Sequence, residues 1–153
     1  MRKFSYLLSG VLVLACLAQA AQEGKAPEKD KSPRTLKVKL NYTGAGKVDA
    51  KHQIFVFVFD SPDFVQGSAM PIAAKSASAK DEIVVCPDLT ASPVYVAVSY
   101  DPTGGYDGQS GPPPSGSSMG IYSKSPGKID PIEIGGGKTV QVEVTFDDTA
   151  KMP

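Results

Sequence analysis

The sequence predicts an all-β fold, a single β-sandwich of about seven short strands preceded by a signal peptide and a flexible tether. Several segments alternate apolar and polar residues, which is the pattern of a strand with one solvated face. Glycine and proline, at 15 and 13 of 153 residues, separate these segments as turn residues do. Outside the N-terminal segment no long stretch shows a helical period, so a helical domain is not expected.

The first half of the domain contains the strongest strand patterns. Residues 36–42 alternate Leu, Val, Leu and Tyr with polar side chains, which predicts a strand with one buried face. Residues 54–59 (IFVFVF) are apolar on both faces, as in a central strand buried on both sides. After a turn at 60–63, a short strand is expected at 70–73, and the small and polar residues 74–82 are expected to form a connection.

The second half continues with shorter strands. A strand is expected at residues 83–86, where Pro87-Asp88 should end it. A further strand is expected at residues 94–100, with valines on one face. A long loop rich in Gly and Pro is expected at 101–120. Residues 129–134 predict an edge strand because Pro131 interrupts them. After a Gly-rich turn, residues 139–146 alternate inward Val and Phe with polar residues.

The N-terminal segment predicts export. Arg2 and Lys3 are followed by an apolar run at 7–17, and Ala18-Gln19-Ala20 has the small-x-small pattern of a leader-peptidase site. The run is too short to span a bilayer as a permanent helix. We therefore expect a periplasmic or extracellular protein, with a signal peptide at 1–20, a charged tether at 21–34, a β-sandwich domain at 35–148 and a tail at 149–153.

An alternative N-terminus stays open, because Val13-Leu14-Ala15-Cys16 resembles a bacterial lipobox. In that case Cys16 is lipidated and becomes the first residue of the mature protein. The tether at 21–34 then separates the domain from a membrane surface.

Charge and cysteine content argue against several classes of protein. Without the first twenty residues, 14 basic and 16 acidic side chains leave a net charge of −2, with no clustered basic face for nucleic acid. Cys86 is then the one cysteine, so no internal disulfide can form, and the apolar run before it predicts a buried thiol. His52 is the single histidine, and no Gly-x-Ser-x-Gly motif accompanies it, so hydrolysis is poorly supported.

Four segments resemble the transthyretin-like (prealbumin-like, carboxypeptidase-regulatory-type) sandwich: IFVFVFD at 54–60, PVYVAVSYD at 93–101, GGYDG at 104–108 and GIY at 120–122. The resemblance covers residues 35–148 and implies a transthyretin-like, Ig-like β-sandwich. The resemblance also implies an accessory module of the bacterial envelope, which binds or spaces other parts and is not a catalyst. The long, proline-rich loop after Asp101 departs from the short turn expected there.

The 101–120 loop is the predicted site, because a loop of this length inside a compact domain needs a functional or packing reason. Asp101 and Asp107 flank two glycines, and oxygen ligands on such a loop suit Ca²⁺, although the EF-hand pattern is missing. Tyr100, Tyr106 and Tyr122 could line a binding surface or pack the loop onto the sandwich.

These observations favour a non-catalytic binding or structural accessory module of the bacterial cell envelope. Its partner is expected to be a protein or a small molecule, with no nucleic acid and no transmembrane segment in the mature form. The alternative is a small-molecule or Ca²⁺ carrier that uses the 101–120 loop, and a hydrolase is the least supported. No cofactor is expected, apart from Ca²⁺ in that alternative.

Overall fold

The structure is a computed structural model and describes residues 32–153. The predicted signal peptide at 1–20, the alternative at Cys16 and the tether up to residue 31 lie outside the described residues. Among residues 32–153, the structure contains no helix that could span a membrane.

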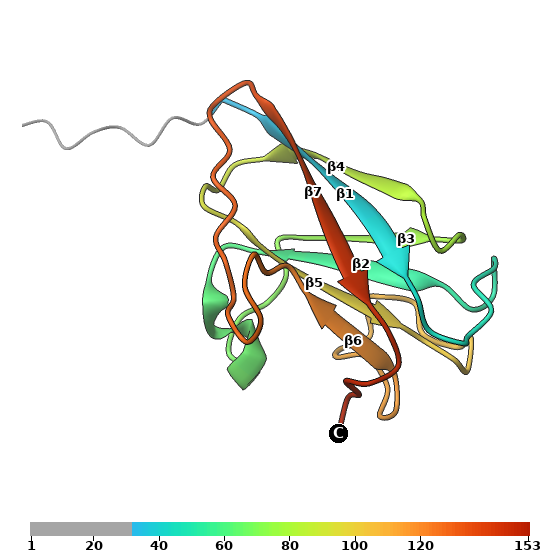
Figure 1. Ribbon diagram of the computed structural model, residues 1–153. Helices are drawn as coiled ribbons and strands as arrows, with labels where there is room; N and C mark the ends of the chain where they lie inside the picture. The colour runs from blue at the N-terminus through green and yellow to red at the C-terminus, as the bar shows by residue number, and fades with distance from the viewer. Residues whose placement is uncertain (1–31) are drawn as a thin grey trace, which may run out of the picture.

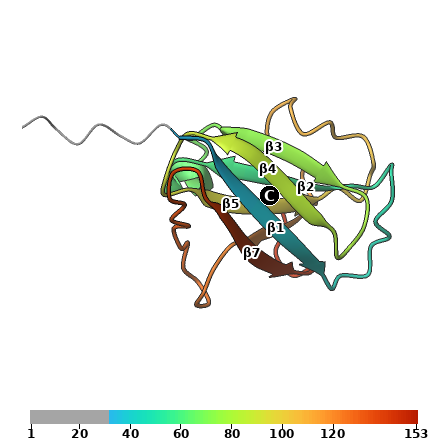
Figure 2. The same ribbon diagram turned by 90° about the horizontal axis from the view of Figure 1, so that it is seen from above.

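The described residues form seven strands in two facing sheets, together with one short 3-10 helix, η1. The elements are β1 (Arg34–Tyr42), β2 (Ile54–Phe59), η1 (Pro62–Gln66), β3 (Ala73–Ala77), β4 (Ile83–Leu89), β5 (Tyr95–Tyr100), β6 (Ser118–Ile121) and β7 (Thr139–Phe146). One sheet has the order β4-β1-β7 and the other β3-β2-β5-β6 (Figures 1 and 2). The predicted all-β sandwich class is thereby confirmed.

Strand directions follow from the pairing. β1 runs antiparallel to β4 and parallel to β7, whereas all pairs of the four-stranded sheet are antiparallel. The parallel pair joins the first and last strands among residues 32–153, so the three-stranded sheet forms only when both ends of the domain are present.

The core lies between the sheets and uses the alternation predicted for β1 and β7. Leu36, Val38 and Leu40 have no exposed surface, and Val144 beside them is 1% exposed. Burying each such side chain stabilises the fold by about 1.5–3 kcal/mol. Cys86 belongs to the same core as a buried free thiol, as predicted.

β2 is buried on both faces, as its sequence predicts. Its even-numbered residues face the other sheet, and Phe55, Phe57 and Phe59 face the opposite way yet are at most 8% exposed. Two loops cover these rings: Phe64 of η1 stacks on Phe59 with centroids 4.4 Å apart, and Tyr106 meets the edge of Phe55 at 4.9 Å. The four-stranded sheet is therefore covered on its outer face as well.

β3 and β4 differ most from their predicted bounds. β3 spans residues 73–77 instead of 70–73, because pairing with β2, and not alternation, makes this small-residue segment a strand. β4 continues past Cys86 through Pro87 to Leu89. An edge strand tolerates proline, and the irregular register there accommodates Asp88 at a φ of 58°.

The predicted strand at 129–134 is wrong, since Ile132 alone pairs there, in an isolated antiparallel bridge with Val94. Ile132 and Ile134 are nevertheless buried in the core. β6 lies inside the segment expected to be a loop at 101–120, so the connection itself is 101–117.

Both ends of the domain extend further than predicted. Arg34, assigned to the tether, is the first residue of β1 and is buried, and its Nε donates to a backbone carbonyl at 2.7 Å. At the other end, the N–H of Met119 donates to Ala150 at 2.9 Å, and the N–H of Met152 donates to Ser117 at 2.9 Å. The predicted tail thus bonds to β6 and the residues before it, with one isolated bridge between Ser118 and Lys151.

Candidate functional site

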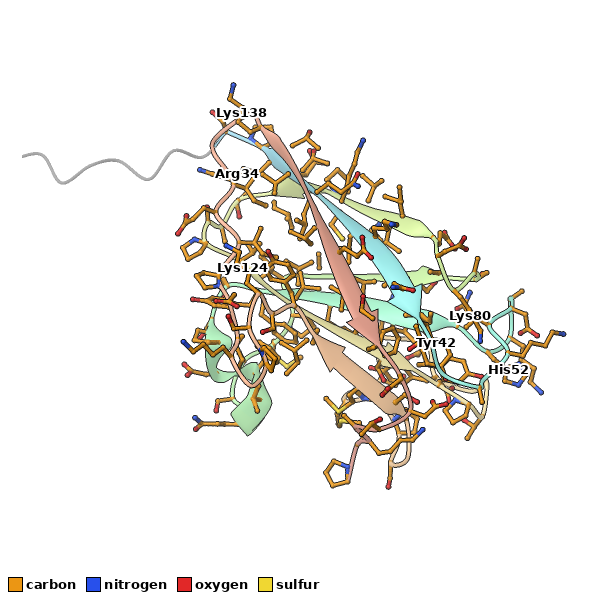
Figure 3. The ribbon with its side chains drawn as sticks, viewed as in Figure 1. Arg34, Tyr42, His52, Lys80, Lys124 and Lys138 are labelled. Carbon is orange, nitrogen blue, oxygen red and sulfur yellow. The ribbon has the colours of Figure 1, made fainter. Side chains whose placement is uncertain are left out.

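Four chain segments meet at one end of the sandwich, here called the loop end. β1, β5 and β7 finish there and β2, β4 and β6 begin there, so the segments 43–53, 78–82, 101–117 and 147–153 lie together. Figure 3 shows Tyr42, His52 and Lys80 at this end, whereas Arg34 and Lys138 mark the opposite end, where β1 and β7 begin.

Asp148 joins its own segment, 147–153, to the 43–53 segment and to the adjacent ends of β1 and β6. Its Oδ1 accepts hydrogen bonds from the hydroxyls of Ser118 at 2.6 Å and Tyr42 at 2.7 Å, and its Oδ2 accepts the N–H of Ala45 at 2.9 Å. The ammonium of Lys151 lies 3.3 Å from Oδ1. These donors, Ser118 first, stabilise the carboxylate and hold the pKa of Asp148 well below its ordinary value.

Tyr42 is a fixed donor beside that carboxylate. Its ring centroid lies 4.9 Å from those of Tyr100 and Phe146, inside the core. Burial, followed by the bond to Asp148, raises the pKa of Tyr42 to about 12, so the hydroxyl keeps its proton at neutral pH. Gly44 lies against this ring, where a Cβ would come within 2.4 Å of the hydroxyl oxygen.

Lys80 attaches the 78–82 segment to the same group. Its Nζ donates to the carbonyl of Gly44 at 2.7 Å and lies 5.0 Å from the centroid of the Tyr42 ring. This distance is within the range of a cation–π interaction. All the connections at the loop end except 101–117 therefore converge directly on Tyr42 and Asp148.

Asp49 organises the 43–53 segment. Its Oδ1 accepts the N–H of His52 at 2.9 Å and of Lys51 at 3.0 Å, and it lies 3.0 Å from Nδ1 of His52. These backbone donors, His52 first, lower the pKa of Asp49. The single histidine of the chain thus takes part in a turn whose geometry the aspartate sets.

Asp101 organises the start of the 101–117 loop. Its side chain is 1% exposed, and each carboxylate oxygen accepts two hydrogen bonds. Oδ1 accepts the N–H and hydroxyl of Thr103 at 2.8 and 2.6 Å, and Oδ2 accepts the N–H groups of Gly105 and Tyr106, both at 2.9 Å. Burial opposes the charge, but these four donors outweigh it and lower the pKa of Asp101.

Asp107 organises the middle of the same loop. It accepts the hydroxyl of Ser110 at 2.6 Å and the N–H groups of Gln109 and Ser110, both at 2.8 Å. These bonds, the hydroxyl first, lower the pKa of Asp107 to about 2. Tyr106 completes the arrangement, because its hydroxyl donates to the carbonyl of Gly111 at 2.6 Å while its ring covers Phe55.

The two aspartates predicted as Ca²⁺ ligands are therefore engaged by donors of their own loop. A carboxylate oxygen that already accepts two hydrogen bonds, as both oxygens of Asp101 do, has no lone pair directed at a cation. Within residues 32–153 no group of three or more His, Cys, Asp or Glu side chains could hold a metal ion. The geometry therefore gives no support to Ca²⁺ ligation by Asp101 and Asp107 at this loop.

The three predicted tyrosines do not share a surface. Tyr100 is 4% exposed on the inner face of β5, where its hydroxyl donates to the carbonyl of Lys47 at 3.0 Å. Tyr106 lies on the outer face of the same sheet. Tyr122 follows β6 at the opposite end, half-buried against the core, with its N–H bonded to Val96 at 2.9 Å. Tyr106 is thus the one that packs the loop onto the sandwich.

Cys86 lies in a poor environment for a nucleophile. It has no exposed surface, and burial raises the pKa of its thiol. A reactive thiolate requires a lowered pKa and access to substrate. The dyad of Cys86 and His52 that a cysteine hydrolase would need is therefore unsupported by the geometry.

Sequence reasoning missed Asp49 and Asp148. A local signal was present for Asp49, since an aspartate two and three residues before the N–H groups it accepts is a common turn feature. No local signal exists for Asp148, whose donors Tyr42 and Ser118 lie 106 and 30 residues away in the chain.

Comparisons of this chain with protein-family models, with curated proteins and with solved structures found no match. The likeness to the transthyretin-like sandwich accordingly stays a prediction from the four sequence segments that carry it.

Proposed function

We propose that this chain is an exported, non-catalytic binding or structural module of the bacterial cell envelope, and that the loop end makes its contacts. The observation that carries the proposal is the position of the loops, together with the hydrogen bonds that hold them. The loops gather at the end of the sandwich opposite to the start of β1, and aspartate side chains fix them in place.

The end at which the chain enters the domain supports this assignment. The chain enters at the end where β1 and β7 begin, so whatever precedes residue 32 attaches there. A module held through its N-terminal segment presents its opposite end outward, and that end is the loop end. Rigid scaffolds with protruding loops are a common basis for binding surfaces.

Preorganisation supports it as well. Ordering a loop on binding costs free energy, and a loop held beforehand avoids much of that cost. Asp101, Asp107 and Asp148 each accept at least three hydrogen bonds from donors at the loop end. Their carboxylates thus hold the loops, and side chains between these anchors, such as Lys51, Gln109 and Pro112, remain exposed.

The test compares two matched sets of substitutions in affinity capture of the tagged protein from envelope extracts of its host. The first set is Lys51→Ala, Gln109→Ala and Pro112→Ala at the loop end. The second is Lys124→Ala, Gln66→Ala and Pro131→Ala, which are exposed residues of the same three types in connections at the opposite end.

We expect the loop-end set to lose the partner that the unsubstituted protein captures and the second set to retain it. Retention by the loop-end set, or loss by the second set alone, would move the contact surface elsewhere. Both sets spare the anchoring aspartates, so a common urea unfolding midpoint would show that the fold is unaffected.

A further inference from the structure

The two sheets present four edge strands, and three of them are protected against pairing with another chain. The segment 149–152 lies along β6. β4 carries Pro87 and a left-handed Asp88, and β3 has five residues that include Lys75. Proline, irregular register, short length and lysine are the usual means by which natural sheets avoid edge-to-edge association.

The fourth edge strand, β7, has none of these features. Its eight residues contain no proline, glycine or lysine, and its register with β1 is continuous from Thr139 to Phe146. β7 lies at the outer side of its sheet, with β1 between it and β4 (Figure 2).

Two backbone hydrogen bonds show which groups of β7 face outward. Thr35 donates its N–H to Lys138, and Thr43 donates its N–H to Phe146. Because hydrogen bonds in a parallel ladder involve alternate residues, the even-numbered residues of β7 bond to β1. The N–H and C=O groups of the odd-numbered residues 139–145 point away from β1, and no backbone hydrogen bond joins them to another element among residues 32–153.

The sequence of this strand is nearly palindromic. Residues 139–145 read TVQVEVT, which is symmetric about Val142 apart from the exchange of Gln141 for Glu143. If two such strands pair antiparallel about a two-fold axis at Val142, each Thr139 meets a Thr145, each Val140 a Val144, and each Gln141 a Glu143. These are favourable cross-strand pairs, and the amide of Gln141 can donate to the carboxylate of Glu143.

We propose that β7 pairs antiparallel with β7 of a second copy of this chain, with the two-fold axis at Val142. The outward N–H and C=O groups of residues 139, 141, 143 and 145 then bond to each other, and two three-stranded sheets become one continuous sheet. Such an interface uses the same strand in both copies and therefore closes at a dimer.

Neighbouring registers are less favourable. A shift that centres the axis on Glu143 places this carboxylate opposite itself, and like charges directly opposite destabilise a sheet. A shift to Gln141 leaves Thr145 without a residue of the other β7. The register at Val142 also leaves the ion pair of Glu143 with Lys39, at 3.1 Å, in place.

The dimer has a geometric consequence. Because the two β7 strands run in opposite directions, the loop ends of the two copies point away from each other. The assembly is then suited to bridging two partners. The dimer itself does not depend on the proposed function, since it rests on the edge of β7 alone.

The first test measures the mass of the purified protein, as recovered from cells, by light scattering over a range of concentrations. We expect a monomer–dimer equilibrium. Gln141→Glu should raise the dissociation constant by about two- to thirtyfold, because it creates two Glu–Glu pairs per dimer. In the monomer this substitution places an acid beside Lys37, its register neighbour on β1, so the fold itself should not be weakened.

Gln141→Lys should have the opposite effect on the dimer, because each lysine then faces a Glu143. Gln66→Glu on η1, an exposed residue outside the strands, is the matched control and should change nothing. A protein that stays monomeric at all concentrations overturns the proposal. A dimer insensitive to both Gln141 substitutions overturns the β7 interface, and a stable complex with another protein in place of self-association shows that the edge has a different occupant.

The second test addresses the register. In Val142→Cys the two introduced thiols meet at the two-fold axis, in a pair whose Cα separation of about 4.5 Å is within the range of a disulfide. We expect a cross-linked dimer under mild oxidation. Val140→Cys should not cross-link, since Val144 opposes it, and Cys86 is buried and should not interfere. Equal cross-linking of both variants would contradict this register.

Discussion

At the scale of single residues, aspartates define the loop end. Asp49, Asp101, Asp107 and Asp148 each accept hydrogen bonds from backbone N–H groups, and all four have a lowered pKa. Three of them act within a few residues of their own position, whereas Asp148 joins segments far apart in the chain. A substitution of Asp148 should therefore affect the whole fold more than a substitution of Asp107.

Asp148→Asn tests this role. The substitution keeps the size of the side chain but removes the charge that Tyr42, Ser118 and Lys151 stabilise. We expect the free energy of unfolding in urea to fall by about 2 kcal/mol, the usual contribution of hydrogen bonds to a charged group. Asp60→Asn, at an exposed residue following β2, is the control, and an equal loss there would contradict the special role of Asp148.

The lowered pKa values predict how stability depends on pH. A carboxyl group with a lower pKa in the folded state binds more protons when the chain is unfolded, so its protonation favours unfolding. Its contribution to the free energy of unfolding is therefore complete above the unfolded pKa of about 4. It is lost as the pH falls through the folded pKa, which for Asp107 is about 2. We expect the free energy of unfolding to decline from about pH 5 to pH 2.

The comparison of variants makes this prediction specific. In Asp148→Asn the free energy of unfolding should fall less steeply between about pH 5 and pH 2, because one of the groups with a lowered pKa is absent. Unfolding monitored by circular dichroism at several pH values provides the curve. A wild-type stability that is constant down to pH 2 would show that these carboxylates are not stabilised in the folded state.

At the scale of the elements, β2 differs from the strands around it because both of its faces are covered. β1, β4 and β7 alternate buried and more exposed positions, whereas all six residues of β2 are buried. Phe55, Phe57 and Phe59 form an outer row on the face of β2 directed away from the other sheet. η1 and the 101–117 loop cover this row and shield it from solvent. The loops therefore contribute to the stability of the sheet beneath them.

Phe57→Ala tests the outer row. Phe57 is 6% exposed on the face directed away from the core between the sheets. We expect the substitution to lower the free energy of unfolding by about 3–5 kcal/mol, as for a phenylalanine in a main core. Val85→Ala on β4, where the side chain is 44% exposed, should change it by no more than about 0.5 kcal/mol.

The C-terminal segment is attached to the four-stranded sheet by backbone hydrogen bonds. A chain that ends at Thr149 loses the backbone bonds of residues 150–152 to the segment 116–119. We expect its free energy of unfolding to fall by about 1–3 kcal/mol, since each hydrogen bond contributes about 1 kcal/mol. Lys151→Ala in the full chain, which keeps the backbone bonds, should cost less, and equal losses would assign the effect to the Lys151 side chain.

At the scale of the whole molecule, the fold rests on its core without a disulfide in the described residues. Cys86 lies between the sheets with no exposed surface, so a thiol reagent can reach it only when the sandwich opens. We expect its modification, followed by mass spectrometry of the Cys86 peptide, to proceed at the rate of global unfolding and to accelerate in urea. Rapid modification of the native protein would contradict the placement of Cys86 in the core.

Much of the fold was accessible from the sequence because the relevant signals are local. Alternation in residues 36–42 and 139–146 predicts strands with one buried face, and the IFVFVF segment predicts a strand buried on both faces. The structure contains all three strands. The small residues of β3 carry no such signal, and Pro131 with its flanking isoleucines resembles an edge strand while only Ile132 pairs. The sequence predicts Asp101 and Asp107 as ligands, whereas the structure shows their carboxylates accepting hydrogen bonds from their own loop.

The sequence by itself determined the class of the fold and which faces of its strands are apolar, because a period of two follows directly from strand geometry. Tertiary structure decided which strands pair, including the parallel pairing of β1 with β7, since this depends on segments about a hundred residues apart. It also decided that Asp148 meets Tyr42 and Ser118, and that β7 is left with an open edge. These features arise from contacts between distant segments, and no pattern within a single segment records them.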